Sequence, residues 1–399
     1  MPIPGQDQRA TRPGLALLAL AMGGFAIGTT EFATMSLLPY MAAGLGIDEP
    51  TAGHVISAYA LGVVVGAPVI AVLAAKVARR TLLVALMAVF AVANGMSALA
   101  PDYGTMMAFR FLSGLPHGAY FGVAALVAAS LVPPERRAQA VARTMLGLTV
   151  ATIVGVPLAN WMGQALGWRW GLGIVAVLAT ATAILVQAFV PKGGPPRGAS
   201  PLRELGALGR RQVWLTLGIG AIGFGGMFAV YTYVANTLME VTQVAPGVVP
   251  VVLCVFGMGM TAGTLAGAWA ADRALMPTIG GILLWSAAAL ALFPLAAGNL
   301  WTVSLVVFLI GGGGGLGTAL QTRLMDVAGD AQTLAAALNH SAFNAANALG
   351  PWLGGMAIAA GWGWTSTGWV GCALALGGFA VWVVSVLDER AVTEVAEAR

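Results

Sequence analysis

The composition of this 399-residue chain excludes an ordinary soluble domain. Hydrophobic residues make up 59% of it and charged residues only 9%, whereas a soluble domain carries about 25% charged residues. Two long blocks, Ala274–Thr322 and Ala331–Leu387, contain no Asp, Glu, Lys or Arg, and neither shows the strict alternation of an outer-membrane strand. These blocks predict membrane-spanning helices, each of about 20 residues.

Twelve helical crossings fit the apolar blocks in chain order. We expect them at residues 14–43, 51–75, 81–100, 104–131, 139–165, 168–190, 213–238, 247–271, 277–297, 300–325, 332–360 and 365–387. The break after the sixth crossing is the only long polar one, and it contains Pro195, Pro196 and five basic residues. The predicted organisation is a cytoplasmic lead at 1–13, a six-helix bundle at 14–190, a cytoplasmic linker at 191–212, a second six-helix bundle at 213–387 and a cytoplasmic tail at 388–399.

Basic residues are expected to collect on the cytoplasmic side of a membrane. With the N-terminus placed inside, all of the 19 Lys and Arg residues except Arg110 and Arg169 fall on that side. This asymmetry predicts that both termini are cytoplasmic. It also accounts for the net charge of +4 without a nucleic-acid partner.

The two halves of the chain repeat each other. Pro157 is followed ten residues later by Gly167, and Pro351 is followed ten residues later by Gly361. The two prolines are 194 positions apart, and so are the two glycines. Two parallel repeats of six helices are typical of transporters whose binding site lies between the repeats, near the bilayer midplane. We therefore expect an all-α integral membrane fold of two pseudo-symmetric six-helix bundles.

Glu31 places a carboxylate inside the otherwise apolar first crossing. An ionisable group at membrane depth costs about 2.5–3.5 kcal/mol or more, and it indicates a functional site. The helix rise puts Glu31 about 24 Å and Arg110 about 22 Å from the inner edge, so the two lie at about the same depth. A carboxyl group that alternates between an ionised form beside a cation and a protonated, neutral form suits proton coupling. A fixed ion pair, or a hydrogen bond to a neighbouring helix, is the structural alternative.

Two histidines also lie at membrane depth. His117 is seven residues after Arg110 and shares its helix face, where it could relay protons or simply pack. His340 heads a polar stripe that continues with Asn344 and Asn347. Such a stripe lines a cavity or holds helices together.

The candidate substrate ligands are polar side chains of the predicted interface between the bundles: Thr34, Tyr231, Asn236, His340 and Asn344. Few charges accompany them, which suits a small uncharged molecule. Three scattered histidines and no paired carboxylates at membrane depth predict no metal, no cofactor and no enzymatic activity. The glycine-rich segments do not precede a Lys-Ser or Lys-Thr pair, so that no ATP-binding loop is indicated.

Five segments carry a family resemblance: GTTEF at 28–32, AGHVISAYALGVVVGAP at 52–68, RFLSGLPHGAYFGV at 110–123, GVPLANWMGQALGWR at 155–169 and LNHSAFNAANALGPWLGG at 338–355. They resemble the major facilitator superfamily, specifically the twelve-helix drug:proton antiporter family and its arabinose-efflux-permease-like branch. The resemblance spans nearly the whole chain.

The resemblance implies roles for individual residues. Arg110 matches the membrane-embedded arginine that the family associates with proton coupling, and Glu31 matches the acidic residue that related exporters use for protons. Gly147, Gly155 and Pro157 match much of the antiporter motif of the fifth helix, which is read as a mark of export.

The loop between the second and third crossings departs from the family pattern. A gating motif of the GxxxDRxGRR type is expected there, but Lys76, Arg79 and Arg80 stand without its aspartate and glycines. The second copy keeps more of the pattern at Asp272 and Arg273. This difference implies that the charge lock of the motif is weaker or supplied elsewhere.

We expect a proton-coupled exporter of a drug, sugar or nucleoside-like molecule in a bacterial inner membrane, with protons, substrate and lipid as its partners. The alternative is a symporter or facilitator that imports a small neutral solute. Because the two halves enclose a site within one chain, we expect a monomer.

Overall fold

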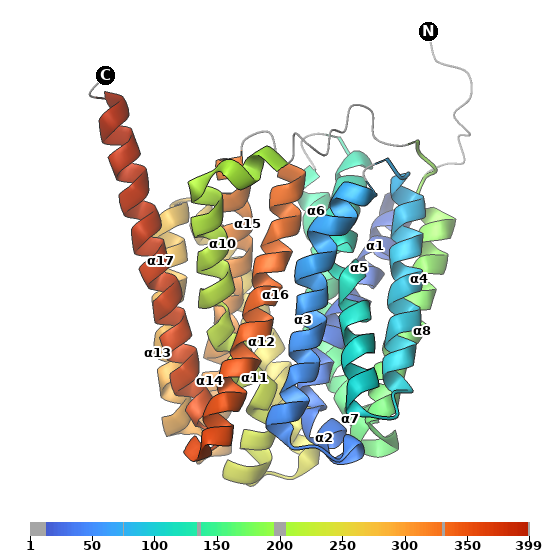
Figure 1. Cartoon of the computed structure of the whole chain (residues 1–399), viewed down its shortest axis with the longest axis vertical. Coiled ribbons are helices and arrows are strands. Elements are labelled where there is room, and N and C mark those ends of the chain that lie inside the picture. The colour runs from blue at the N-terminus through green and yellow to red at the C-terminus, as the bar shows by residue number, and fades with distance from the viewer. Residues whose placement is uncertain (1–12, 75, 134–136, 195–204, 329–331, 398–399) are drawn as a thin grey trace.

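The computed structural model describes residues 13–74, 76–133, 137–194, 205–328 and 332–397. The described chain is helical throughout, and the helices run roughly antiparallel in two neighbouring bundles (Figure 1). Eleven stretches of the described residues are long and apolar enough to span a membrane. The remaining crossing, the eleventh in chain order, contains α16 (Gln332–Ala357), which carries the polar stripe of His340, Asn344 and Asn347.

The N-terminal bundle contains the first six crossings. Its helices are α1 (Pro13–Ser36), α2 (Leu38–Leu45), α3 (Glu49–Leu73), α4 (Arg79–Ala98), α5 (Tyr103–Ser130), α6 (Arg137–Val150), α7 (Val156–Leu166) and α8 (Trp168–Phe189). The predicted crossings are recovered with small shifts at their ends. The first one is interrupted at Leu37, because Pro39 in the first turn of α2 has no N–H to continue the helix.

The C-terminal bundle contains the last six crossings. Its helices are α10 (Arg211–Gly223), α11 (Gly225–Asn236), α12 (Val249–Ala271), α13 (Leu275–Ala296), α14 (Leu300–Gly311), α15 (Gly315–Ala328), α16 and α17 (Ser366–Glu397), with short 3-10 turns at Leu205–Gly209, Pro246–Val248 and Gly312–Gly314. The last helix runs beyond the predicted end at 387, since residues 388–397 contain no Gly or Pro to stop it.

Wide π-helical turns interrupt three crossings. They lie at Ala151–Gly155 between α6 and α7, at Thr237–Val241 after α11 and at Ile358–Trp362 after α16. Such turns are rare in proteins, and many of those that occur lie at functional sites. The last one contains Gly361 and is followed by Gly363, whose φ angles are +83° and +79°. Glycine adopts this left-handed region without strain, and the predicted turn between the last two crossings is confirmed.

α3 and α16 lie side by side along the contact between the bundles (Figure 1). We call the end of the molecule where α8 finishes and α10 begins the linker end, and the other the opposite end. Near the opposite end, Gln164 donates to the Pro246 carbonyl at 2.9 Å, and about two helical turns farther in, Ser57 donates to the Ala348 carbonyl at 3.1 Å. Both hydrogen bonds join one bundle to the other, so that the opposite end is closed.

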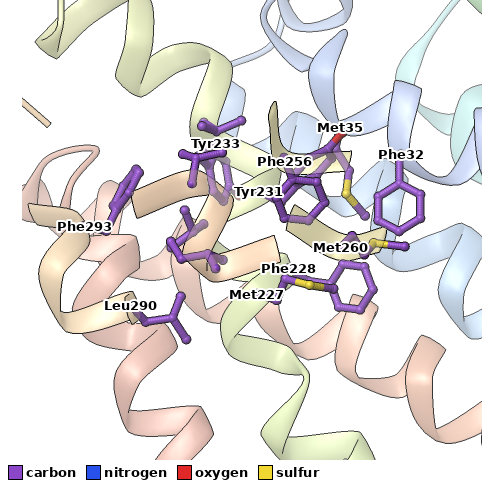
Figure 2. Packing of buried hydrophobic residues seen from close by; sticks show 14 of the residues in the cluster. Phe32, Met35, Met227, Phe228, Tyr231, Tyr233, Phe256, Met260, Leu290 and Phe293 are labelled. Atoms are coloured by element: carbon purple, nitrogen blue, oxygen red, sulfur yellow. The ribbon is translucent and has the colours of Figure 1, made fainter. Parts of the chain in front are cut away.

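A hydrophobic cluster crosses the same contact. Phe32 of α1 meets Phe228 and Tyr231 of α11 and Phe256 of α12 (Figure 2). The ring centroids of Phe32 and Tyr231 are 5.5 Å apart in an edge-on arrangement, which is a favoured geometry for aromatic pairs. The residue after Glu31 therefore anchors α1 in the C-terminal bundle.

Candidate functional site

Glu31 lies at the contact between the two bundles. It is 2% exposed, and its Oε1 accepts a hydrogen bond of 3.1 Å from Nδ2 of Asn347 on α16. Every residue of α1 from Ala26 to Ser36 is buried, so that the carboxyl group is enclosed by protein. Its hydrogen-bond partner is a neutral amide from the other bundle.

Arg110 is buried one helix away and faces other partners. Its Nη1 donates to the Thr30 hydroxyl at 3.1 Å and to Oδ1 of Asn94 at 3.4 Å. Its Cζ lies 4.5 Å from the centroid of the Tyr59 ring, a cation–π contact that stabilises a desolvated cation. Although the sequence suggests Arg110 as a partner of Glu31, the two described side chains form no ion pair within 4.0 Å.

The carboxyl group of Glu31 thus has an amide partner and, among the described residues, no ion-pair partner within 4.0 Å. Breaking a buried ion pair by removing one charge is strongly destabilising, whereas a hydrogen bond to an amide needs no charge on the acid. The guanidinium of Arg110 is stabilised separately by Thr30, Asn94 and Tyr59. Among the described residues, no cation depends on Glu31 for an ion pair.

His117 continues the polar chain that begins at Arg110. Its Nδ1 lies 2.9 Å from the Tyr59 hydroxyl, and its ring centroid is 5.9 Å from that of His340 on α16. His340 stacks on Phe121, with centroids 4.9 Å apart and ring planes 3° from parallel. The two histidines thus meet across the contact between the bundles.

Three of the predicted substrate ligands are buried with a polar atom unsatisfied. These atoms are Oη of Tyr231, Oδ1 of Asn236 and Oδ1 of Asn344, none of which has a hydrogen-bond partner among the described residues. A buried polar atom without a partner costs about 1–3 kcal/mol. By contrast, the hydroxyl of Thr34 is engaged with the Thr30 carbonyl at 2.6 Å.

The residues of the predicted antiporter motif lie where the fifth crossing packs on α1. A Cβ atom on Gly147 would overlap the backbone of Ala21 and Phe25, and one on Gly155 would overlap the Thr29 side chain. Pro157 stands in the first turn of α7, directly after the π-helical turn. These glycines permit a close approach of helices, and the proline accompanies the change of helical register.

The predicted gating residues lie at the linker end and contact their own bundles. Arg80 donates to the backbone carbonyl of Gln187 and, at 3.2 Å, to its side chain. Arg273 donates to the Trp269 carbonyl at 2.7 Å and covers the Trp269 ring at 3.8 Å. Asp272 follows the last residue of α12. Lys76 and Arg79 lie just before α4 and in its first turn.

Four residues of the site carry no role in the sequence-based assignment of proton and substrate ligands: Thr30, Tyr59, Asn94 and Asn347. Asn347 belongs to the polar stripe of the eleventh crossing, which is the signal that could have identified it. Asn94 is an amide inside an apolar helix, which is a comparable signal. Thr30 and Tyr59 become recognisable only through their contact with Arg110.

Comparison with known proteins agrees with this architecture. The family model of the Major Facilitator Superfamily matches residues 20–331. The chain belongs to the major facilitator superfamily. It is 42% identical over 356 residues to the inner membrane transport protein YdhP of Escherichia coli K12, covering 88% of this chain and 90% of that protein.

Two further similarities extend the comparison. A chloramphenicol resistance protein of Streptomyces lividans is 34% identical over 345 residues, covering 84% of this chain and 87% of that protein. A crystal structure of the nucleoside transporter NupG superposes with a TM-score of 0.71 at 13% identity, covering 94% of this chain and all of that one. This second likeness shows the fold. The chain is a multi-pass inner-membrane transporter with two six-helix bundles.

Proposed function

We propose that this protein exports a small molecule in exchange for protons, and that Glu31 carries the proton. The observation that carries the proposal is the hydrogen bond between Glu31 and Asn347. It places a buried carboxyl group on the contact that must open and close if the two bundles alternate between the two sides of the membrane. The charge state of Glu31 is thereby linked to the position of the bundles.

The physical basis of coupling is the cost of a buried charge. A protonated Glu31 is neutral and can remain between the bundles while it accepts the hydrogen bond from Asn347. An ionised Glu31 in the same place loses its hydration, which costs several kcal/mol unless another group compensates. Loss of the proton therefore favours conformations in which water or Arg110 reaches the carboxylate, and binding of the proton favours closure around it.

Arg110 acts in this scheme as the coupling residue, and His117 as a relay. The guanidinium is held beside α1 by Thr30, the residue before Glu31. A rotation of α1 that breaks the bond to Asn347 can bring Glu31 toward this cation. The Tyr59–His117 hydrogen bond offers protons a polar route toward His340.

The proposed substrate site is formed by the unsatisfied polar atoms of Tyr231, Asn236 and Asn344. His340 precedes Asn344 by one helical turn, Thr34 follows Phe32 by two residues, and the aromatic residues of Figure 2 form the apolar wall. A substrate that accepts or donates hydrogen bonds there recovers the cost of these buried atoms. This chemistry suits an uncharged drug, sugar or nucleoside-like molecule. Because the site lies inside one chain, a monomer suffices.

Export is supported by the similarity to a protein named for chloramphenicol resistance and by the glycines and proline of the fifth crossing. Among the described residues, the loops and helix ends at the linker end hold nearly all the Lys and Arg, while Arg169 lies at the opposite end. By the positive-inside rule, we assign the linker end to the cytoplasm. The closed opposite end then faces outward.

The test is transport in proteoliposomes under an imposed pH gradient, with a panel of phenicols, sugars, nucleosides and lipophilic cations. We expect one class of compound to move in the direction opposite to protons. Glu31→Gln should abolish this gradient-driven movement, although its side chain can still accept the hydrogen bond from Asn347. Substrate movement in the same direction as protons would establish import instead. Full gradient-driven transport by Glu31→Gln would exclude Glu31 as the proton carrier.

A further inference from the structure

A cavity of about 410 Å³ lies at the linker end of the N-terminal bundle. Its wall combines the start of α4, the end of α5 and the segment that follows α8, and it is formed by Arg79, Arg80, Val127, Ser130, Leu131 and residues 190–194. α4 and α8 pack within their own bundle. The cavity is therefore separate from the site around Glu31.

Three cations converge on this cavity, and no Asp or Glu is among the lining residues. The guanidinium of Arg80 is held in place by the Gln187 backbone carbonyl and side chain, which occupies two of its five N–H donors. Arg79 and Lys192 form no ion pair within 4.0 Å with any described residue. The cavity thus contains one oriented cation and two that have no carboxylate partner in the described part of the chain.

The backbone adds further donors. α4 begins at Arg79, and the preceding Ala78 has an extended conformation and no side chain that could cap the helix. The first N–H groups of this 20-residue helix consequently lack a capping acceptor, and the positive end of the helix dipole lies beside the three cations. Phosphate groups bind in such surroundings.

Part of the cavity wall is apolar. Val127, Leu131 and Val190 belong to its wall, and Phe189 and Val77 are exposed nearby in sequence at the end of α8 and before α4. At a membrane surface, exposed apolar side chains beside a basic cavity match a molecule that has both a phosphate group and acyl chains. Basic pockets between transmembrane helices on the cytoplasmic side bind anionic lipid headgroups.

We propose that this cavity binds a phosphate-bearing anion, and that its source is the headgroup of an anionic phospholipid. Arg80 positions the phosphate, while Arg79 and Lys192 neutralise it. The site is independent of proton coupling, so that its test does not depend on the proposed transport function.

The test is a binding titration of the full-length protein in neutral detergent. Dihexanoyl phosphatidylglycerol, dihexanoyl phosphatidylcholine and inorganic phosphate are the probes, and microscale thermophoresis gives Kd. The variant Arg79→Gln/Lys192→Gln removes the two cations other than Arg80. Arg143→Gln/Arg210→Gln removes the same charge from exposed positions at the linker end outside the cavity, and Arg79→Lys/Lys192→Arg preserves the charge.

We expect the wild type to bind phosphatidylglycerol at least tenfold more tightly than phosphatidylcholine. The Arg79→Gln/Lys192→Gln variant should lose at least tenfold, whereas the control and charge-preserving variants should stay within about twofold of the wild type. Competition by inorganic phosphate at concentrations similar to the lipid would identify a free anion as the source, and its absence would identify the lipid. Equal binding by the wild type and the Gln variant, or an equal loss in the control, would overturn the proposal.

Discussion

The closed opposite end depends on the absence of a side chain at Gly53. A Cβ atom at this position of α3 would lie 2.5 Å from Oη of Tyr233, and one at Gly355 of α16 would lie 2.6 Å from the same oxygen. The Tyr233 hydroxyl donates to the Pro351 carbonyl at 3.0 Å, so that it cannot move aside freely. Gly53→Ala therefore places a methyl group against a fixed atom of the other bundle.

The magnitude follows from these contacts. Displacement of Tyr233 breaks a neutral hydrogen bond, worth about 0.5–1.5 kcal/mol, and residual overlap in a packed contact costs about 1–3 kcal/mol. We expect Gly53→Ala to disfavour the closed opposite end by about 2 kcal/mol relative to the open one. At 1.4 kcal/mol for each factor of ten, this is a shift of about 30-fold in the equilibrium between them.

The assay is a distance measurement by double electron–electron resonance. Spin labels at Glu49 and Trp362 report the separation of the bundles at the opposite end, after Cys254 and Cys372 are replaced by Ser. We expect the wild type to populate short distances, and Gly53→Ala to add a population at longer distances.

Two controls separate the steric effect from helix propensity. Gly53→Ala/Tyr233→Phe removes the oxygen that the methyl group meets and should restore the short distances. Gly281→Ala, a helical position of α13 with no atom within 4 Å of the added Cβ, should leave the distances unchanged. An unchanged distribution in Gly53→Ala, or a failure of Tyr233→Phe to reverse the change, would refute the reasoning.

Three further predictions concern stability and binding. Arg323→Gln removes the buried guanidinium that binds Glu389 at 2.9 Å and should lower the free energy of unfolding by about 2 kcal/mol. Arg211 binds Asp388 but is exposed, so Arg211→Gln should lower it by less than about 1 kcal/mol. Thermal unfolding in detergent compares the two variants, and equal losses would contradict this difference. Hydrogen bonds from Thr51 lower the pKa of the exposed Asp48 carboxyl. The contribution of Asp48 to the free energy of unfolding is therefore present at neutral pH and is lost as pH falls through its folded-state pKa. The Tm difference between the wild type and Asp48→Asn should shrink on acidification, and a difference that grows would contradict the lowered pKa. Tyr231→Phe removes an unsatisfied buried hydroxyl. Its Tm should equal or exceed that of the wild type, while its affinity for the substrate falls about tenfold. A lower Tm with unchanged affinity would show that Tyr231 is not part of the site.

The sequence predicts the number and order of the crossings well, because each apolar block must match the thickness of the bilayer. It does not predict where the crossings bend. The interruption at Leu37 arises from Pro39, and the π-helical turn before Pro157 accommodates packing against α1 and α12. A proline alone does not decide where a crossing bends, because Pro68 and Pro116 lie inside continuous helices. The packing of neighbouring helices also contributes, and it is not encoded in a local pattern.

The site shows the same division. Helix rise places Glu31 and Arg110 at the same depth, but it does not fix the rotation of each helix about its axis. Arg110 is turned toward Thr30, Asn94 and Tyr59. The polar face of the eleventh crossing is readable as a stripe, whereas the contact of Asn347 with Glu31 depends on how the two bundles pack together.

The central claim is that the carboxyl group of Glu31 exchanges a proton when substrate binds. The most direct measurement is proton release by purified protein in weakly buffered detergent, followed with a pH indicator on addition of the compound that the transport panel identifies. We expect release of about one proton for each substrate bound by the wild type, and none by a Glu31→Gln variant that still binds the compound. Undiminished proton release by Glu31→Gln would contradict it.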